Sequence, residues 1–476
     1  MRISILAAVF ALALAGAPVH ARTAAGQATL PLAPHGVIGV GDAQLTASFW
    51  LKRLHQPDRV IMDAAAIDRW NARVTELDPF VYDLHDLPQK LDRKTLRGWI
   101  ENLSTRPDRT LYDVHGNAVT DAALDALVQN LALDAIPEQT DVRYGLVVHR
   151  AMLRTFPTTE RVFSRKGDTD IDRFQESGMF PGTPVAVLHA SADHQWLFVE
   201  APRYRAWVQA KHVAIGPASE VFGYVGKTPF RVVTGASVDT VFTPEAPAVS
   251  QLQLDMGTRV PYAPEWPADK PVNGQGPYAS YVIELPLRQD DGTLGFSHAL
   301  LQKNADTHDG YLPLTRANIV RQAFKFLGER YGWGHAFDGR DCSGFVSDVY
   351  RSMGVHMPRN TSAQSVSPAA NRIAFGKSTT QAERTRAVGN LEVGDLIYIP
   401  GHVMMVIGHL HGQPYVIHDT SGAAFRGPDG EMHHVKLNGV SVTPLLPLMA
   451  NARESYIDHM TAIVRIRPQG TTGAKQ

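Results

Sequence analysis

The chain has 476 residues, of which 44% are hydrophobic, and its formal net charge at pH 7 is -1. This balance gives no general attraction to nucleic acid or to an anionic membrane surface, and we find no nucleic-acid-binding motif. The length exceeds what one hydrophobic core usually supports, so we expect three or four modules.

The first 21 residues have the pattern of a secretory signal peptide. A basic start at Met1-Arg2 precedes an apolar run from Ile3 to Ala17, and Val19-His20-Ala21 fits cleavage after Ala21. No later run approaches the roughly 20 apolar residues that a membrane-spanning helix needs. We therefore expect a soluble exported protein, periplasmic or secreted, without a transmembrane anchor.

Residues 22–143 are predicted to form a mainly helical N-terminal region that acts as a cap. Thr120 is a good N-cap for a helix over 121–131, because acidic residues in the first turn and apolar residues near helical spacing follow it.

The pattern then changes to short β-rich runs, which are typical of small barrels. Residues 184–189 and 195–199 are two such runs within a first predicted SH3-like module over 144–216. A comparable pattern begins at Gly257, 75 residues after Gly182, and predicts a second SH3-like module over 217–312.

Residues 313–468 are predicted to form the last module, followed by a disordered tail over 469–476. Thr315 is a predicted N-cap for its first helix. The only cysteine, Cys342, starts a second helix, where unpaired backbone N–H groups and the helix dipole favour a thiolate and a lowered thiol pKa. A lone thiol in an exported protein has no disulfide partner, so we interpret Cys342 as a nucleophile; the alternative is a small buried apolar residue.

The chain contains 20 histidines, so position must select the one that handles protons for the thiol. Strand patterns predict a hairpin centred near residue 410, which places His402 and His418 roughly opposite one another. We therefore predict a Cys-His-His constellation. Asp419 is an alternative partner for His402, but strand alternation directs it to the face opposite that of His418.

A zinc peptidase is an alternative suggested by the many histidines. The chain has no His-Glu-x-x-His run, and His409 and His411 fall at the predicted turn tip. We expect neither a metal nor another cofactor.

The last module carries several further motifs around these residues. They are Tyr331-Gly-Trp-Gly334, Asp341-Cys-Ser-Gly-Phe345, Met357-Pro-Arg359 with Ser362 and Gln364, Gly394-Asp395, Gly401-His-Val403 and the later His418. Together they resemble the NlpC-type bacterial cell-wall cysteine peptidases. The resemblance implies an α+β fold, in which a papain-like NlpC-type catalytic domain follows two small SH3-like β-barrels and a mainly helical N-terminal region.

The resemblance also implies roles for individual residues. Cys342 is the nucleophile, His402 is the general base and later the acid, and His418 orients His402. The backbone N–H of Cys342 is expected to form part of the oxyanion hole. Members of the multidomain branch of this family hydrolyse the bond between γ-D-glutamate and a diamino acid, usually meso-diaminopimelate or lysine, in peptidoglycan stem peptides.

Asp341 has two interpretations that do not exclude each other. It is a good helix N-cap, and the resemblance implies that it holds the free amine of an N-terminal L-alanine. Ser343, Ser362, Trp333 and Tyr331 are the other predicted substrate contacts.

His335 departs from the family pattern, which often has a glycine at this position. A side chain there either narrows the cleft or points outward, and it affects the shape of a subsite more than catalysis.

We therefore predict a cysteine endopeptidase for the γ-D-glutamyl–diamino acid bond that prefers a free N-terminal L-alanine. The alternatives are a cell-wall amidase or acyltransferase with the same cysteine core, and a noncatalytic peptidoglycan-binding SH3-like protein. The expected partners are stem peptides or muropeptides, and we expect a monomer.

Overall fold

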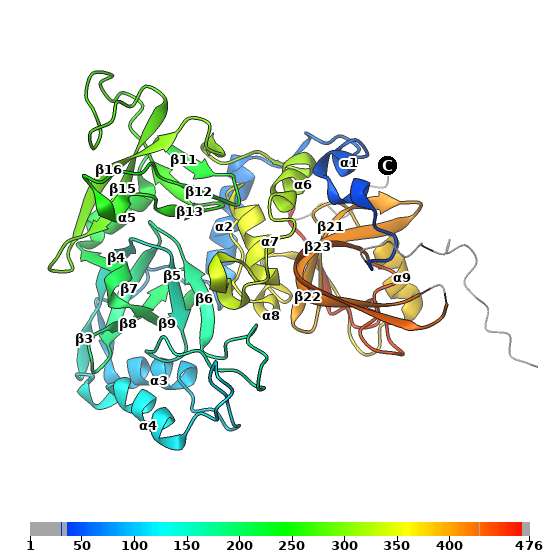
Figure 1. Cartoon of the computed structure of the whole chain (residues 1–476), viewed down its shortest axis with the longest axis horizontal. Helices are drawn as coiled ribbons and strands as arrows, with labels where there is room; N and C mark the ends of the chain where they lie inside the picture. Colours follow the sequence, from blue (N-terminus) through cyan, green and yellow to red (C-terminus); the bar gives the residue numbers. More distant parts are fainter. Residues whose placement is uncertain (1–29, 31–35, 428, 469–476) are drawn as a thin grey trace, which may run out of the picture.

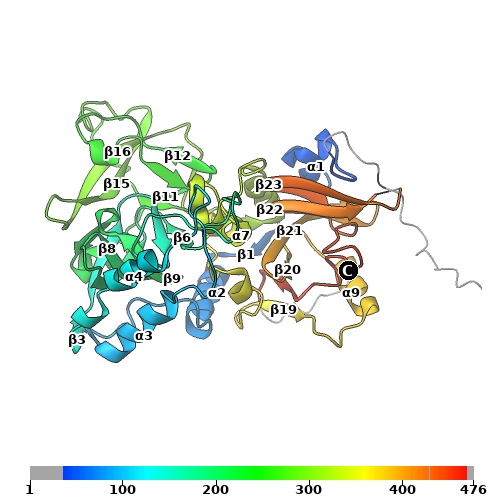
Figure 2. The ribbon, with the colours of Figure 1, turned by 60° about the horizontal axis from the view of Figure 1, so that its bottom comes forward.

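The computed structural model describes residues 30, 36–427 and 429–468, so the predicted signal peptide and the predicted tail lie outside the described residues. Two lobes lie on either side of the helix α7 (Cys342–Arg351), as both ribbon views show (Figures 1 and 2). One lobe contains the two β-rich modules, and the other contains the C-terminal sheet. No helix among the described residues combines the length and apolarity needed to cross a bilayer.

The N-terminal helices divide between the two lobes. Helix α2 (Ala64–Leu77) is capped by Asp63 and buries Trp70 and Val74 in the core that also contains α7. Strand β1 (Val60–Met62) pairs with β18 (Leu314–Thr315) at the start of the C-terminal domain. The other elements of this part are η1 (Asp42–Leu45) and α1 (Ala47–Leu51), which precede β1.

The later N-terminal helices pack on the first β module instead. Thr120 caps α4 (Asp121–Asn130) as predicted, with its hydroxyl accepting a hydrogen bond from Ala123 N at 3.2 Å. Leu96, Ile100 and Leu124 share a core with Phe198 and Trp207 of the β module. The remaining elements of this part are β2 (Lys90–Asp92), α3 (Arg93–Leu103), η2 (Leu133–Ala135) and β3 (Gln139–Asp141).

The first β module is one sheet with the strand order β10-β4-β7-β8-β9-β5-β6. The two predicted runs correspond to β7 (Pro184–Ala190) and β8 (Trp196–Ala201), whose alternating apolar side chains fill two buried cores. Its other elements are β4 (Arg143–Val147), β5 (Ala151–Arg154), β6 (Gln175–Met179), β9 (Tyr204–Gln209), η3 (Ala210–His212) and β10 (Val213–Gly216).

The second β module follows α5 (Ala218–Gly226) and consists of three small sheets around a core of its own. The prediction that it is SH3-like stays a prediction. Its elements are β11 (Phe230–Val233), β12 (Ser237–Asp239), η4 (Pro247–Val249), β13 (Gln253–Asp255), β14 (Arg259–Pro261), β15 (Ser280–Arg288), β16 (Leu294–Gln302) and β17 (Thr307–Asp309).

The C-terminal domain is a sheet of order β19-β24-β20-β21-β22-β23 with helices on both faces. The face toward α7 buries Val403, Met405 and Ile417, whereas Met404 and Val406 enter a second core that includes side chains of α9. The elements are α6 (Arg316–Phe324), η5 (Trp333–Asp338), α7, α8 (Thr361–Gln364), β19 (Asn371–Ala374), α9 (Gln381–Gly389), β20 (Leu396–Ile399), β21 (His402–Leu410), β22 (Gln413–Arg426), β23 (Met432–Pro444) and β24 (Ala462–Arg465).

A buried ion-pair network joins the second β module to α7. The Arg340 side chain, 1% exposed, donates to Asp255 at 2.8 Å and to Asp348 at 3.0 Å. It also pairs with Glu329 at 2.9 Å and donates to the backbone oxygen of Ala236 at 2.8 Å. Burial of these charged groups costs free energy, but separating them would leave a buried charge without compensation, so the network holds α7 and the second β module in this arrangement.

Candidate active site

Cys342 occupies the first turn of α7, as predicted, and it is 5% exposed. Asp341 caps this helix by accepting a hydrogen bond from Gly344 N at 2.8 Å. The thiol faces the start of β21, where its Sγ lies 4.0 Å from the carbonyl oxygen of Gly401. The residues on either side of His402 therefore line the thiol, since the N–H of Val403 also bonds to it.

The expectation of a lowered thiol pKa is wrong in direction. Burial raises the pKa of Cys342 to about 12, and the negative charge of Asp341 adds to the increase. The hydrogen bond from Val403 N–H and the charge of Arg359 oppose it without reversing it. A helix N-terminus favours a thiolate only modestly, whereas complete removal of water is a larger effect of the opposite sign.

His402 and His418 lie side by side, and His402 Nε2 is 2.7 Å from His418 Nδ1. The other ring nitrogen of His418, Nε2, is 3.0 Å from the hydroxyl of Thr443. These contacts form a continuous chain across three neighbouring strands, from His402 on β21 through His418 on β22 to Thr443 on the edge strand β23.

The predicted hairpin register is wrong, although the two imidazoles meet. Leu410 pairs with Gln413 and Met405 with Ile417, with an irregularity after Val406. Continuing this register places Met404 opposite His418, so His402 is its diagonal neighbour. Diagonal residues remain within reach of long and aromatic side chains, which explains why the contact tolerates the shift.

Burial also sets the charge states of the histidines. It lowers the pKa of His402 to about 4 and lowers that of His418 well below its usual value, with the neighbouring His402 as a second cause for His418. At neutral pH the resting site therefore holds a thiol and two neutral imidazoles. Among the described residues, Cys342 and His402 share no direct hydrogen bond.

Asp419 does not take the place of His418 as a partner of His402. It is fully buried, and neither of its carboxylate oxygens has a hydrogen-bond partner within the described residues. Burial raises its pKa well above the usual value, and the charges of Asp341 and Glu329 raise it further.

The Asp341 carboxylate is fully occupied by its neighbours. Its Oδ1 accepts from Gly344 N, the Ser343 hydroxyl and Arg359 Nη1, and its Oδ2 accepts from Gly334 N and Arg359 Nη2, all within 2.8–3.1 Å. Burial raises the pKa of Asp341, but the charge and hydrogen bonds of Arg359 outweigh it. The net effect is a strongly lowered pKa. The structure thus shows the N-cap interpretation directly, and a substrate amine would have to displace one of these donors.

The other predicted substrate contacts differ in how deeply they are buried. Ser343 is 4% exposed and bonds to Asp341 and Arg359, whereas Ser362 is exposed on α8. Tyr331 is partly buried, and burial together with the nearby Cys342 raises its pKa.

Trp333 joins the site to the first β module. Its Nε1 donates to the backbone oxygen of Gln175 at 2.9 Å. The residue lines a cavity of about 330 Å³ whose walls also come from the segment 105–111 and from Phe174 and Glu176.

Two residues of the site had no role in the sequence prediction. Arg359, 3% exposed, belongs to the motif Met357-Pro-Arg359, but the sequence indicated no separate role for it. No sequence pattern pointed to Thr443. His335 contradicts both expectations for it, because its side chain is 1% exposed and points into the protein.

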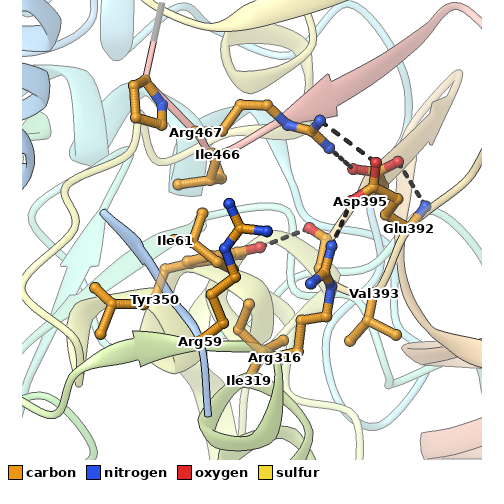
Figure 3. A pocket seen from close by; sticks show the side chains of 13 residues that line it. Arg59, Ile61, Arg316, Ile319, Tyr350, Glu392, Val393, Asp395, Ile466 and Arg467 are labelled. Atoms are coloured by element: carbon orange, nitrogen blue, oxygen red, sulfur yellow. Dashed lines mark hydrogen bonds and ion pairs between the residues drawn. The ribbon is translucent and has the colours of Figure 1, made fainter. Parts of the chain in front are cut away.

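A separate cavity of about 230 Å³ lies between β1, α6 and the segment 466–468 that follows β24 (Figure 3). Arg316 pairs with Glu392 at 2.7 Å, and Arg467 lies 3.3 Å from Asp395. The described residues that line it include none of the predicted site residues, and both ion pairs lie within the C-terminal domain, so we interpret them as structural contacts of that domain.

Comparisons with known proteins agree with this architecture. Residues 328–457 match the NlpC/P60 family, and residues 161–209 match an SH3 domain of the SH3b1 type. A γ-D-glutamyl-L-lysine dipeptidyl-peptidase of Bacillus cereus is 27% identical over 221 residues, which are 43% of this chain and 54% of that protein. The chain thus spans about half the length of that curated relative.

A solved structure shows the same fold. An NlpC/P60 endopeptidase from Photobacterium damselae subsp. piscicida superposes with a TM-score of 0.70 at 16% identity, over 88% of this chain and 97% of that one. An NlpC/P60 family protein from Bacillus cereus ATCC 10987 has a TM-score of 0.46 at 20% identity, over 68% of this chain and 100% of that one. The first comparison confirms the predicted mixed α+β architecture, in which an SH3b domain precedes the C-terminal domain.

Proposed function

Because this chain carries an NlpC/P60 domain behind an SH3b domain, we propose that it is a cysteine peptidase that cuts peptidoglycan stem peptides. The observation that carries the proposal is the arrangement of Cys342 at a capped helix start against the strand that bears His402. The chain of contacts from His402 through His418 to Thr443 supports the same conclusion.

In the proposed reaction, Cys342 Sγ attacks the carbonyl carbon of the scissile amide and loses its proton to His402. His402 then protonates the leaving amine, and a thioester to Cys342 remains. Water, deprotonated by His402, hydrolyses the thioester and restores the thiol. The N–H of Cys342 at the start of α7 is the proposed donor to the oxyanion.

Both Cys342 and His402 are neutral before the reaction starts. A pKa of about 12 for Cys342 and about 4 for His402 disfavours a preformed thiolate–imidazolium pair. Proton transfer to His402 must then accompany substrate binding or attack. His418 supports this step because its contact with His402 holds the imidazole in one orientation.

We propose that the bond cut is the one between γ-D-glutamate and a diamino acid, meso-diaminopimelate or lysine. The motifs of the last module and the activity named for the Bacillus cereus relative support this choice. We place the activity outside the cytoplasm, in the periplasm or after secretion, where such stem peptides are exposed.

A preference for a free N-terminal L-alanine is a separate part of the proposal. It requires an acidic group for the amine, and the occupied carboxylate of Asp341 must give up a donor to serve. Substrate pairs that differ only at this nitrogen therefore test the preference independently of the bond cut.

The test is mass spectrometry of digests of L-Ala-γ-D-Glu-diaminopimelate and of the same stem attached to muramic acid. Release of L-Ala-γ-D-Glu by the wild type, and none by Cys342→Ala, supports the proposed bond and nucleophile. Cutting of both substrates retains the peptidase and removes the preference for a free amine. Cutting of neither substrate contradicts the proposal and favours an amidase, an acyltransferase or a binding protein.

A further inference from the structure

His335 is held inside the protein between the first β module and α7. Its backbone has a φ of +66°, a value that residues other than glycine rarely adopt. The backbone is fixed from the β module, because Arg150 donates to the oxygen of His335 at 2.9 Å and Gln175 donates to the oxygen of Gly334 at 2.8 Å.

Two glycines make room for the imidazole. A Cβ on Gly178 of β6 would lie 2.8 Å from His335 Cβ, and a Cβ on Gly344 of α7 would lie 2.7 Å from His335 Cε1. Both distances are too short for real Cβ contacts, so any larger residue at either position would displace the ring. The imidazole is therefore wedged between a strand of one module and the first turn of the catalytic helix.

The ring contributes one specific hydrogen bond. Arg359 Nη2 donates to His335 Nδ1 at 3.0 Å, so the Nδ1 atom carries no proton. Burial and the charge of Arg359 lower the pKa of His335 to about 3, which keeps the ring neutral. Its Nε2 lies 3.8 Å from Asp348 Oδ2 and has no hydrogen-bond partner among the described residues.

Arg359 uses its remaining donors on groups that surround the first turn of α7. Its Nε donates to Ser177 of β6 at 2.8 Å, and its two terminal nitrogens hold Asp341. His335 thus completes the set of acceptors that keeps this buried cation next to the carboxylate beside Cys342.

We infer that His335 is a positioning residue, whose neutral imidazole fixes Arg359 on Asp341 and thereby sets the electrostatic environment of the Cys342 thiol. The inference rests on the proposed role of Cys342 as nucleophile. It assigns a function to the residue at which this sequence departs from the motif that it resembles.

Charges on three neighbouring residues act on the thiol pKa. Asp341 and Asp419 raise its pKa, whereas Arg359 lowers it. If the hydrogen bond from His335 is lost, Arg359 is free to move, and the charge of Asp341 acts on the thiol with less compensation. The titratable and charged groups near the thiol are Asp341 at the start of α7, Arg359 before α8, Asp419 on β22, Tyr331 before η5, Tyr398 on β20 and His402 on β21.

The test compares His335→Gly with His335→Asn in the full chain. Glycine accepts the positive φ but removes the acceptor, whereas asparagine tolerates the same backbone region and places Oδ1 where Nδ1 lies. The readout is the rate of Cys342 alkylation by iodoacetamide between pH 7 and 9, with steady-state kcat and KM on the free tripeptide measured in parallel.

We expect about tenfold slower alkylation in His335→Gly, equivalent to a rise of about one unit in thiol pKa, and a lower kcat. His335→Asn should restore both to within about threefold of the wild type, in line with a retained hydrogen bond. Phe180→Leu is the matched control, because this ring packs on His335 with centroids 5.4 Å apart and has no nitrogen or oxygen atom that could accept the hydrogen bond from Arg359. It should lower the melting temperature and leave alkylation unchanged.

Equal alkylation rates in the wild type and His335→Gly would overturn the inference, as would a loss in His335→Gly that His335→Asn does not restore. A slowing in Phe180→Leu equal to that in His335→Gly would also overturn it, because packing alone would then explain the effect. Alkylation needs no substrate, so these results stay separate from a failure of the proposed peptidase activity.

Discussion

Replacement of Arg340 by methionine should destabilise the junction between the second β module and α7. The guanidinium makes five hydrogen bonds, to Asp255, Asp348, the backbone oxygen of Ala236 and both oxygens of Glu329. Asp255 and Asp348 are both 0% exposed, so methionine fills most of the volume but leaves buried carboxylates with less compensation.

The size of the loss in unfolding free energy depends on the ion-pair partners that Asp255 and Asp348 keep. Removing one partner from a buried ion pair typically costs about 3–5 kcal/mol. Asp255 keeps Arg150 at 3.3 Å and Asp348 keeps Arg351 at 3.0 Å. We therefore expect a loss near the lower end, about 3 kcal/mol.

The assay is urea unfolding followed by tryptophan fluorescence. Arg330→Met is the matched control, because the Arg330 side chain is 64% exposed and its ion pair within the described residues is with Asp170 at 2.9 Å. The control should cost less than about 1 kcal/mol. Adding Asp255→Asn to Arg340→Met should recover part of the loss, since it removes one of the uncompensated charges. Equal losses in the two single variants would refute the reasoning.

Three further predictions concern the proposed catalytic residues and the buried imidazole of His335. His418→Ala should lower kcat about 10²-fold with little change in KM, because His402 loses the contact that orients it; Thr443→Val should have a smaller effect of the same kind. Cys342→Ala should be folded and inactive, as circular dichroism and product mass would show. The wild type should lose about 2 kcal/mol of stability between pH 7 and pH 5 from His335 alone, measured by urea unfolding at each pH.

The sign of the pH effect follows from proton binding. The pKa of His335 is about 3 in the folded state, below the usual value of 6.5, so the unfolded chain binds more protons between those values. Stability is then fully present above about pH 6.5 and falls as the pH falls toward 3. His335→Asn should remove this part of the pH dependence of stability. If stability falls equally steeply between pH 7 and pH 5 in this variant, His335 is not its source. For the catalytic residues, wild-type kcat in His418→Ala, or activity retained by Cys342→Ala, would reject their proposed roles.

Several parts of the fold were predictable because their signals are local. Thr120 and Asp341 cap helices through hydrogen bonds to N–H groups three residues ahead, so the cap and its partner lie within one short stretch of sequence. Strands β7 and β8 follow from alternation within single runs. The meeting of His402 and His418 was expected from the hairpin, and it survived an error in register because diagonal imidazoles still reach each other.

The charge states of the site were not predictable in the same way. The position of Cys342 in a first turn indicates a lowered thiol pKa, but burial raises it. Arg359 and Thr443 bind the predicted residues through contacts that no local pattern encodes.

The sequence by itself determined the helix caps, the paired strands, and the motifs that select Cys342, His402 and His418. Only the tertiary structure decided where the His335 side chain points, how many donors occupy Asp341, and that the resting thiol is neutral. The physical reason is that a cap depends on neighbours along the chain, whereas desolvation depends on what covers a group. The cover comes from distant segments, as when Asp255 reaches Arg340 from 85 positions away.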